Sequence, residues 1–373
     1  MDAFDVLIAG GGPAGSSCAW KLRDSGLKIA ILDRQTFPRD KVCGGWITPE
    51  VLEALNIDPA EYARGRVLQP ITGFLTSSMG ETPVETHYGK PVSYGIRRCE
   101  FDHYLLERSG ACLRLGLPLT KVERCHGEWI INGQIRARML VGAGGTFCPV
   151  ARLLGAKVNG EIVVAAQEAE FTLDDGQLSA CSVRAETPEL FFCSDMKGYG
   201  WCFRKQNVLN VGLGRLDRHS LSGHVAEFVK FLKTAGRIAL DMPVLLGHAY
   251  LLYGMSNRQL VDDGLLLIGD AAGMAYAQSG EGIRPAIESG LLAANVIAAA
   301  QGSYGRKQLE PYRVSLVDRF GKSENHWVAR LGRHVPAGLI SSVARRLLAT
   351  QWFSREIVLD RWFLHRNEPA LNC

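Results

Sequence analysis

The sequence lacks several patterns that would define a function at once. Its ten cysteines contain no pair spaced as C-x-x-C, which excludes the common zinc and dithiol motifs, and no metal site is predicted. The longest apolar run, LLAANVIAAA, is too short to cross a bilayer. The net charge of +4 is small, so no nucleic-acid partner is expected. A second glycine-rich dinucleotide motif is also absent, so no dedicated nicotinamide domain is predicted.

The bulk composition is that of a folded globular protein. Hydrophobic residues make up 47% of the 373 residues and charged residues 21%. The first residues read as a strand rather than as a charged leader with an apolar segment, so we expect a cytoplasmic protein with reduced thiols. Residues 320–373 hold eight lysines and arginines but four acidic residues. This basic tail is expected to be helical, and it either caps the protein or makes a peripheral contact with an anionic membrane.

Two kinds of sequence pattern alternate along the chain. Apolar strands that end near glycines, such as residues 5–9 and 28–32, alternate with helical patterns and predict a doubly wound α/β frame. Stretches of short strands, for example ACSVRA, YGWCFRK and VLNVGLG, interrupt that frame. We therefore expect a Rossmann-like domain, an inserted antiparallel β-sheet domain that binds the substrate and a C-terminal helical segment. The predicted ranges are residues 1–65, 93–160 and 255–320 for the first, 66–92 and 161–254 for the second, and 321–373 for the third.

The first glycine-rich motif, GGGPAG, joins the first predicted strand to the first predicted helix. Gly10 would make the tight turn, Gly12 would let the backbone approach a diphosphate, and Gly15 would allow the helix to pack closely on the strand. The helix N-terminus adds free N–H groups and a partial positive charge. Asp33, at the end of the second strand, is placed to accept hydrogen bonds from a ribose. Together these features predict a dinucleotide site.

A second strand runs into glycines near the other end of the chain. The segment LLLIGDAAG carries Asp270 in its turn, and SGEGI follows it at the predicted start of a long helix near Gly282. That helix start would direct its dipole and N–H groups toward an electron-rich group. A reduced flavin carries negative charge at N1 and the C2 carbonyl, so the second motif favours FAD over NAD as the bound dinucleotide.

These motifs together resemble those of the flavoprotein superfamily typified by p-hydroxybenzoate hydroxylase and, more closely, those of the geranylgeranyl reductases. The matching segments are GGGPAG, KVCGG, RCEFD, LVGAGG, YGWCFRK and GDAAG with GEGI. The resemblance implies an FAD-binding domain of the glutathione reductase type 2 fold. Three segments depart from the pattern: Arg204 stands where proline is expected, Gly144 replaces an aspartate, and MAYAQS lacks a usual proline.

The resemblance also implies which residues hold FAD. The GGGPAG turn would bind the diphosphate, Asp33 and Arg34 the adenosine ribose, and Val122 the adenine. The KVCGG turn would lie beside the isoalloxazine, where its glycines let the backbone approach a flat ring. The full set of expected FAD contacts is Gly10, Gly12, Pro13, Ala14, Gly15, Asp33, Arg34, Cys43, Gly44, Gly45, Arg98, Val122, Asp270, Gly282 and Ile283.

Alternation along YGWCFRK places Tyr199, Trp201 and Phe203 on one face of a strand. These rings either pack a core or line a cavity for an apolar substrate. Trp46, which stands where the reductases often carry a smaller residue, would narrow that cavity. The expected substrate contacts are Trp46, Tyr199, Trp201 and Phe203.

The function that the resemblance implies is the reduction of a carbon–carbon double bond in an isoprenoid or other apolar substrate, by hydride transfer from reduced flavin N5. NAD(P)H or a ferredoxin-like partner would supply the electrons. The expected catalytic residues are Cys43, Tyr199 and Trp201, and the proton donor would be Cys43, Tyr199 or a water; a plain packing role for Cys43 stays open. The alternatives are a flavin monooxygenase acting through a C4a-hydroperoxide, as a hydroxylase, epoxidase or halogenase, and a flavin electron-transfer protein.

Overall fold

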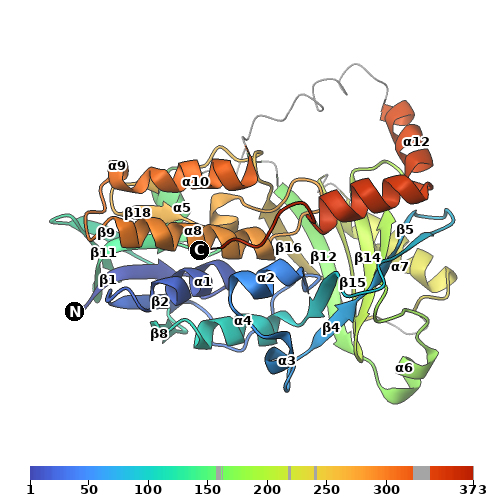
Figure 1. Cartoon of the computed structure of the whole chain (residues 1–373), viewed down its shortest axis with the longest axis horizontal. Coiled ribbons are helices and arrows are strands. Elements are labelled where there is room, and N and C mark those ends of the chain that lie inside the picture. The colour runs from blue at the N-terminus through green and yellow to red at the C-terminus, as the bar shows by residue number, and fades with distance from the viewer. Residues whose placement is uncertain (157–160, 162, 217–219, 239–241, 322–336, 373) are drawn as a thin grey trace.

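The computed structural model describes residues 1–156, 161, 163–216, 220–238, 242–321 and 337–372. Two large sheets lie side by side along the longest axis of the molecule, and the N-terminus is at the far end of the first one (Figure 1). The first sheet has eight strands and the second seven, and a small sheet of three strands accompanies them.

The eight-stranded sheet is the predicted Rossmann-like frame. Its core order is β17-β18-β11-β1-β2-β8, and the neighbours from β18 to β8 are parallel. β10 extends β11 in the antiparallel sense, and β9 pairs with β10. The strands are β1 (Asp2–Ala9), β2 (Ile29–Asp33), β8 (Cys112–Leu115), β9 (Val122–Cys125), β10 (Glu128–Ile131), β11 (Ile135–Gly142), β17 (Val261–Asp262) and β18 (Leu265–Leu267).

Two long helices pack together against this sheet because a glycine lets them approach. A Cβ on Gly290 of α8 would lie 2.3 Å from the carbonyl oxygen of Ala14 in α1, so only glycine fits there. The apolar side chains of β1, β2, β11 and β18 and of both helices form one buried core. The helices of this part are α1 (Pro13–Leu22), α2 (Pro49–Ala54), α3 (Pro59–Tyr62), α4 (Arg98–Glu107), α5 (Pro149–Leu153), η1 (Gly269–Ala272), α8 (Ile283–Ala299), α9 (Arg306–Leu309) and α10 (Pro311–Phe320).

The seven-stranded sheet has the order β16-β12-β15-β14-β13-β5-β6, and every neighbouring pair is antiparallel except β13 and β5. The three-stranded sheet β3-β7-β4 connects it to the first part. The strands are β3 (Trp46–Ile47), β4 (Leu68–Ile71), β5 (Gly73–Ser78), β6 (Val84–His87), β7 (Ser93–Ile96), β12 (Val163–Thr172), β13 (Glu189–Phe192), β14 (Gly198–Lys205), β15 (Val208–Arg215) and β16 (Leu246–Leu251).

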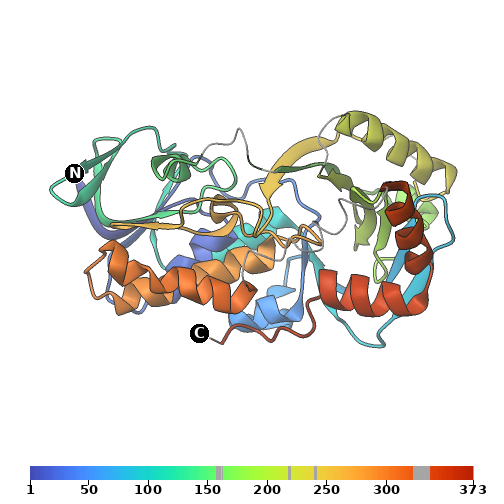
Figure 2. The same ribbon diagram turned by 90° about the horizontal axis from the view of Figure 1, so that it is seen from above.

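The two faces of the seven-stranded sheet have different covers (Figure 2). One face, here called the α7 face, packs Phe191, Cys202 and Val211 against α7 (Leu221–Thr234). The other face, here called the aromatic face, carries Phe192, Tyr199, Trp201 and Phe203. The C-terminal helices lie over the aromatic face; they are α12 (Ala337–Leu348) and η3 (Phe353–Phe363).

The predicted fold class is confirmed, and one predicted strand is wrong. The ACSVRA segment, residues 180–185, does not form a strand: its first residue ends α6 (Asp175–Ala180), residues 181–184 have no regular structure, and residue 185 begins a turn. Asp174 caps that helix by accepting a hydrogen bond from the Gln177 amide, while the Gln177 side chain accepts one in return from the Asp174 amide.

The domain boundaries stay a prediction. The predicted C-terminal helical region includes residues 322–336, which lie outside the described residues. Its described part is helical in α12 and η3. Among the helices that the structure describes, none combines the length and the apolar character needed to cross a membrane.

Candidate active site

The two glycine-rich turns meet at the carboxyl ends of β1, β11 and β18. Gly10 has a φ of +124°, and a Cβ there would lie 2.3 Å from the carbonyl oxygen of Ala143, which follows β11. A Cβ on Gly269, in the second turn, would lie 2.8 Å from the Cβ of Ala14. Gly12 is the N-cap of α1. Because ligands of doubly wound sheets bind at this edge, the turns form one candidate cradle.

Asp33, the expected ribose-binding residue of this cradle, is held in place by backbone hydrogen bonds. Its Oδ2 accepts a hydrogen bond from the Gly11 amide at 2.7 Å, and its Oδ1 accepts one from the Gln35 amide at 2.8 Å. The carboxylate is therefore held in place, and each of its oxygens keeps a further acceptor site. Arg34 is exposed beside it.

Positive charge collects next to the Gly12 turn. Arg98 donates two hydrogen bonds to the fully buried Asp102, at 2.7 and 2.8 Å, and Arg39 lies 3.1 Å from the same carboxylate. A Cβ on Gly12 would lie 3.6 Å from Arg39 Nη2, while Arg39 Nη1 is buried without a hydrogen-bond partner. One carboxylate faces two guanidinium groups here, so positive charge is left over to bind an anionic group.

Asp270 occupies the turn after β18, close to the start of α8. A Cβ on Gly282, the N-cap of α8, would lie 3.5 Å from Asp270 Oδ1. Burial raises the pKa of Asp270, although Lys41, Arg98 and Arg258 lower it. Ile283 is buried behind this turn in a second apolar core.

Lys41 and His248 link the KVCGGW segment to the seven-stranded sheet. Lys41 Nζ lies 3.0 Å from His248 Nδ1. Burial, together with the charges of Lys41 and Arg98, lowers the pKa of His248 to about 3, so the imidazole is neutral. Burial also lowers the pKa of Lys41.

These groups fit FAD. The glycine cradle has no room for side chains, the first turn of α1 offers free N–H groups, Arg39 has an unpaired buried nitrogen, and Asp33 is oriented as a ribose acceptor. The residues that would hold the dinucleotide are Gly10, Gly12, Pro13, Ala14, Gly15, Asp33, Arg39, Arg98, Asp270 and Gly282. Their individual contacts with FAD stay predictions.

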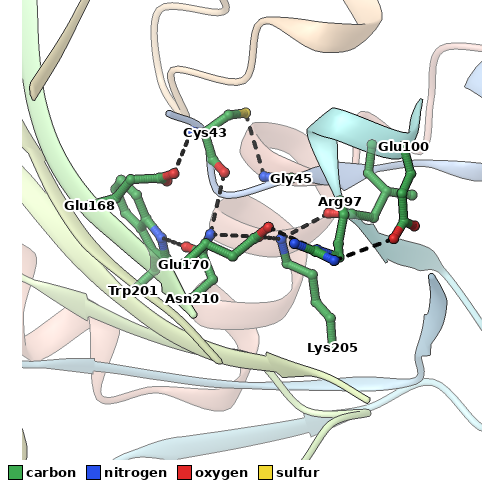
Figure 3. Close-up of polar contacts among 10 residues, drawn as sticks. Cys43, Gly45, Arg97, Glu100, Glu168, Glu170, Trp201, Lys205 and Asn210 are labelled. Carbon is green, nitrogen blue, oxygen red and sulfur yellow. Dashed lines mark hydrogen bonds and ion pairs between the residues drawn. The ribbon is translucent and has the colours of Figure 1, made fainter. Parts of the chain in front are cut away.

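The turn of residues 43–45, here called the Cys43 turn, lies between this cradle, where the Cys43 side chain interacts with Arg98, and the aromatic face. A Cβ on Gly44 would lie 3.6 Å from the Phe203 ring and 3.7 Å from Trp201 Nε1. Gly45 has a φ of +65°, and its amide donates a hydrogen bond to Cys43 Sγ at 3.4 Å. The Cys43 amide in turn donates to Glu168 Oε1 at 2.6 Å (Figure 3). The turn is thus fixed from both sides.

The predicted alternation in β14 is confirmed, because Tyr199, Trp201 and Phe203 share the aromatic face. The Tyr199 ring lies 5.9 Å from Trp201 and 5.2 Å from Phe363 of η3, and its hydroxyl donates to the Ser279 carbonyl at 2.5 Å. Trp46 stacks between Phe74, at 5.1 Å, and Phe363, at 5.5 Å. The rings therefore pack on one another and on η3, and their contact with a substrate stays a prediction.

A buried polar row lies beside these rings (Figure 3). Asn210 accepts from Trp201 Nε1 at 2.7 Å and donates to Glu170 at 3.1 Å and to the Cys43 carbonyl at 3.4 Å. Lys205, fully buried, donates to Glu170 at 2.5 Å. This network ties the Cys43 turn to three neighbouring strands.

The structure does not bring Val122 to the site. Val122 pairs with Ile131, which pairs with Ile135 at the start of β11, whereas the cradle lies beyond the end of β11. Arg204 also leaves the site: it donates to the carbonyls of Val183 and Gln206 and points away from the aromatic rings. Its departure from the reductase pattern therefore leaves the aromatic face unchanged.

Sequence reasoning missed several polar groups of the site. Two of them carried a usable signal: Glu168 and Glu170 alternate on a strand whose other residues are largely apolar, which indicates two carboxylates on one buried face. The others depend on tertiary contacts and carried no such signal. They are Arg39, Lys41, Asn210 and His248, whereas the alternation along YGWCFRK already predicts Lys205 on the face of the rings.

Comparisons with known proteins agree with this geometry. Residues 8–62 match the family model described as an NAD(P)-binding Rossmann-like domain. The chain is 29% identical over 348 residues to the menaquinone reductase of Mycobacterium tuberculosis, which covers 86% of this chain and 81% of that protein. It is 27% identical over 342 residues to digeranylgeranylglycerophospholipid reductase 2 of Methanosphaera stadtmanae, which covers 85% of this chain and 84% of that protein.

A solved structure shares the whole fold. The geranylgeranyl bacteriochlorophyll reductase-like protein of Thermoplasma acidophilum matches with a TM-score of 0.78 and 24% identity, over 94% of this chain and 92% of that one. The comparisons confirm the resemblance to the geranylgeranyl reductases that the motifs indicate, because the chain is similar to reductases of that kind over most of its length.

Proposed function

We propose that this protein is an FAD-dependent oxidoreductase that reduces carbon–carbon double bonds of an isoprenoid or comparably apolar substrate. The observation that carries the proposal is the Cys43 turn, whose cysteine side chain interacts with Arg98 of the dinucleotide cradle and whose Gly44 lies against the Phe203 and Trp201 rings of the aromatic face. Relatives named for digeranylgeranylglycerophospholipid and menaquinone reduction support the same substrate class.

Bound FAD, once reduced, supplies a hydride at N5. The protein's part is to bind and orient the cofactor and the substrate and to shield them from water. The first turn of α1 and the guanidinium groups of Arg39 and Arg98 would neutralise the diphosphate, and Asp33 would fix the adenosine ribose. The start of α8 at Gly282 would stabilise negative charge on the flavin ring. Tyr199 and Trp201, with their polar atoms already bonded to protein, would exclude water and present apolar surface to the substrate.

The electron donor is a reduced nicotinamide dinucleotide or a ferredoxin-like protein. A surface pocket of about 520 Å³ supports the first, because its arginines suit a diphosphate and because Arg39 also borders the Gly12 turn. The charged side chains that line it are Arg39, Asp40, Arg64, Arg66, Arg97, Glu100 and His103. Reduction of the bound flavin by NADPH or by reduced ferredoxin, followed at the flavin absorbance, separates the two donors.

The C-terminal helices support a peripheral contact with a membrane. Val343 and Leu347 of α12 are 56% and 39% exposed, Trp352 is 63% exposed, and Arg345 and Arg346 lie among them. Apolar side chains beside arginines suit an anionic bilayer surface. Sedimentation with anionic vesicles should bring down the protein, and Val343→Asp should reduce that binding; equal sedimentation of both proteins, or none of either, would remove this part of the proposal.

The reaction is tested with the reduced holoprotein and a geranylgeranyl lipid in the absence of oxygen. The expected product is heavier than the substrate by two hydrogens, as measured by mass spectrometry. A product that forms only with oxygen and gains one oxygen atom would indicate a monooxygenase instead. No product under either condition, with flavin bound, would favour an electron-transfer protein.

The cofactor assignment is tested with Asp270→Ala. Loss of a charged acceptor costs about 1.5–3 kcal/mol, so FAD should bind about 10- to 100-fold more weakly. Titration of the apoprotein with FAD, followed by flavin fluorescence, measures the change. Asp24→Ala, which removes a highly exposed aspartate far from the cradle, is the control. Equal affinity of both variants would refute the role of Asp270.

A further inference from the structure

Glu168 is a buried carboxyl group between the Cys43 turn and the aromatic rings. It is 5% exposed and pairs across the sheet with Gly212, which in turn pairs with Trp201. A Cβ on Gly212 would lie 2.3 Å from the Trp201 ring and 2.8 Å from the Cβ of Glu168. The glycine therefore leaves the space through which the indole and the carboxyl group approach each other.

The two oxygens of Glu168 are used unequally. Oε1 accepts the hydrogen bond from the Cys43 amide at 2.6 Å, whereas Oε2 is buried and has no hydrogen-bond partner among the described residues. A carboxylate would leave an anionic oxygen without a donor, which is costly in a buried site. A carboxylic acid fits better, because Oε1 then acts as the accepting carbonyl oxygen and Oε2 carries a proton that it can give away.

Glu170, two residues along the same strand, has the opposite environment. Burial alone would raise its pKa, but the charge and hydrogen bond of Lys205, with help from Asn210 and Arg97, lower it. Burial raises the pKa of Glu168 to about 7, even though the Cys43 amide and Lys205 act against the shift. Two neighbouring carboxyl groups with separated pKa values are typical of an acid beside a charged structural partner.

Other polar groups of the site are less suited to release a proton. The Tyr199 hydroxyl is engaged with the Ser279 carbonyl, and burial raises its pKa well above the ordinary value. His248 is neutral beside Lys41. Glu281 uses Oε1 to cap the start of α8, where it accepts from the Arg284 amide at 2.7 Å. Glu168 combines a free oxygen with a position against the Cys43 turn.

We infer that Glu168 is the proton donor of the proposed reduction. The inference rests on the proposed function and deepens it. When bound reduced flavin supplies a hydride to one alkene carbon, the π bond would break and the proton on Glu168 Oε2 would form the new C–H bond at the other carbon. Glu168 is left as a carboxylate and regains its proton from water. The substrate is thereby reduced by two electrons and gains two hydrogens, while the flavin is oxidised.

The pH dependence of the reduction step follows from the protonated form of Glu168. The reduction step should be fast below about pH 7 and slow down as the pH rises through this value, because Glu168 then loses its proton. Charged and titratable groups face Glu168 from several elements. They are Glu170 on its own strand, Lys205 on β14, Arg98 on α4, and Cys43 in the turn whose amide donates to Oε1.

The test compares Glu168→Gln with Glu168→Asp and Glu189→Gln. Glutamine keeps an oxygen that can accept from the Cys43 amide but cannot give up a proton at neutral pH. Glu189 is the matched control, because it is a buried glutamate of the same sheet whose pKa burial also raises to about 7, and it lies on the α7 face beside Arg237. Far-UV circular dichroism and FAD content verify that each variant is folded and loaded.

Two measurements are made on these proteins. Anaerobic single turnover of the reduced protein should be about 10²- to 10⁴-fold slower in Glu168→Gln, without the fall in rate near pH 7, and Glu168→Asp should recover part of the rate and the pH dependence. Glu189→Gln should keep the wild-type profile. Independently, ¹³C NMR of glutamate carboxyl carbons in the oxidised holoprotein should lose one group that titrates near neutrality when Glu168 becomes Gln.

The outcomes separate the two proposals. A wild-type protein that reduces the alkene together with an equally fast Glu168→Gln variant would overturn the role of Glu168 and leave the proposed function intact. An unchanged NMR titration in Glu168→Gln would also overturn it, because Glu168 would then hold no proton at neutral pH. A wild-type protein that binds FAD but reduces no prenyl substrate would remove the proposed function and this inference with it.

Discussion

The α7 face and the aromatic face belong to the same sheet, yet their chemistry differs. The α7 face is closed by one amphipathic helix, and its core is apolar apart from buried Glu189, which pairs with Arg237. The aromatic face is covered by segments from distant parts of the chain and contains a row of buried polar groups next to its rings. The difference teaches that one face mainly stabilises the sheet, while the other accepts a connected row of costly buried polar groups, as functional sites do.

The largest expected loss of stability comes from a substitution on the α7 face. Phe228 is fully buried there, so Phe228→Ala should lower the free energy of unfolding by about 3–5 kcal/mol. Urea denaturation measures the loss. The same variant, assayed while folded, should keep the substrate preference of the wild type; an altered preference would show that the two faces are not separate in function.

A second difference concerns stability and pH on the aromatic face. The pKa of Glu168 is raised from 4.5 to about 7 by burial, so its favourable contribution is complete below about pH 4.5 and is lost as the pH rises toward and through 7. The loss amounts to about 3 kcal/mol. Glu168→Gln should remove this part of the pH dependence in urea denaturation between pH 4.5 and 8. An identical slope in the variant would contradict the assignment.

Two glycines give a matched test of the two faces. A Cβ on Gly200 would lie 2.5 Å from the Phe228 ring, and a Cβ on Gly212 would lie 2.3 Å from the Trp201 ring. Each alanine substitution should cost about 1–3 kcal/mol by overpacking. Only Gly212→Ala should also slow substrate reduction, because it displaces Trp201 from Glu168 and Asn210. Equal activity losses in both variants would remove the distinction.

The smallest expected effect is a change of substrate preference at Trp46, which is half-buried between Phe74 and Phe363. Trp46→Ala should shift the preference toward longer prenyl chains by about tenfold, because space opens beside the aromatic face. Competition between substrates of two lengths measures the shift. Trp352→Ala, which removes an exposed tryptophan from the same side of the molecule, should leave the preference unchanged.

Much of the frame could be predicted because its signals are local. The period of two in YGWCFRK placed Tyr199, Trp201 and Phe203 on one face, and the structure confirms it. Glycines after buried strands predicted two turns, and parallel strands bring such turns to one edge, so the approach of Gly269 to Ala14 follows from topology.

The remaining features depend on contacts between distant residues. Nothing in the local pattern of the basic tail indicates that Phe363 packs on Trp46 and Tyr199. The pairing of Glu168 with the Cys43 amide likewise requires a strand and a turn that are far apart in the sequence to meet. The strand predicted at ACSVRA was wrong: a side-chain cap at Asp174 starts a helix that takes in Ala180, and the residues after it form no strand.

The packing of Phe363 also sets an order of events during synthesis. A ribosome makes the cradle, from Gly10 to the end of α8, before it makes η3. The nascent chain can therefore complete its cradle while the rings of Tyr199 and Trp201 still face water. The cover of the aromatic face arrives last, so a chain that stops short of η3 would expose these rings to aggregation and to chaperones.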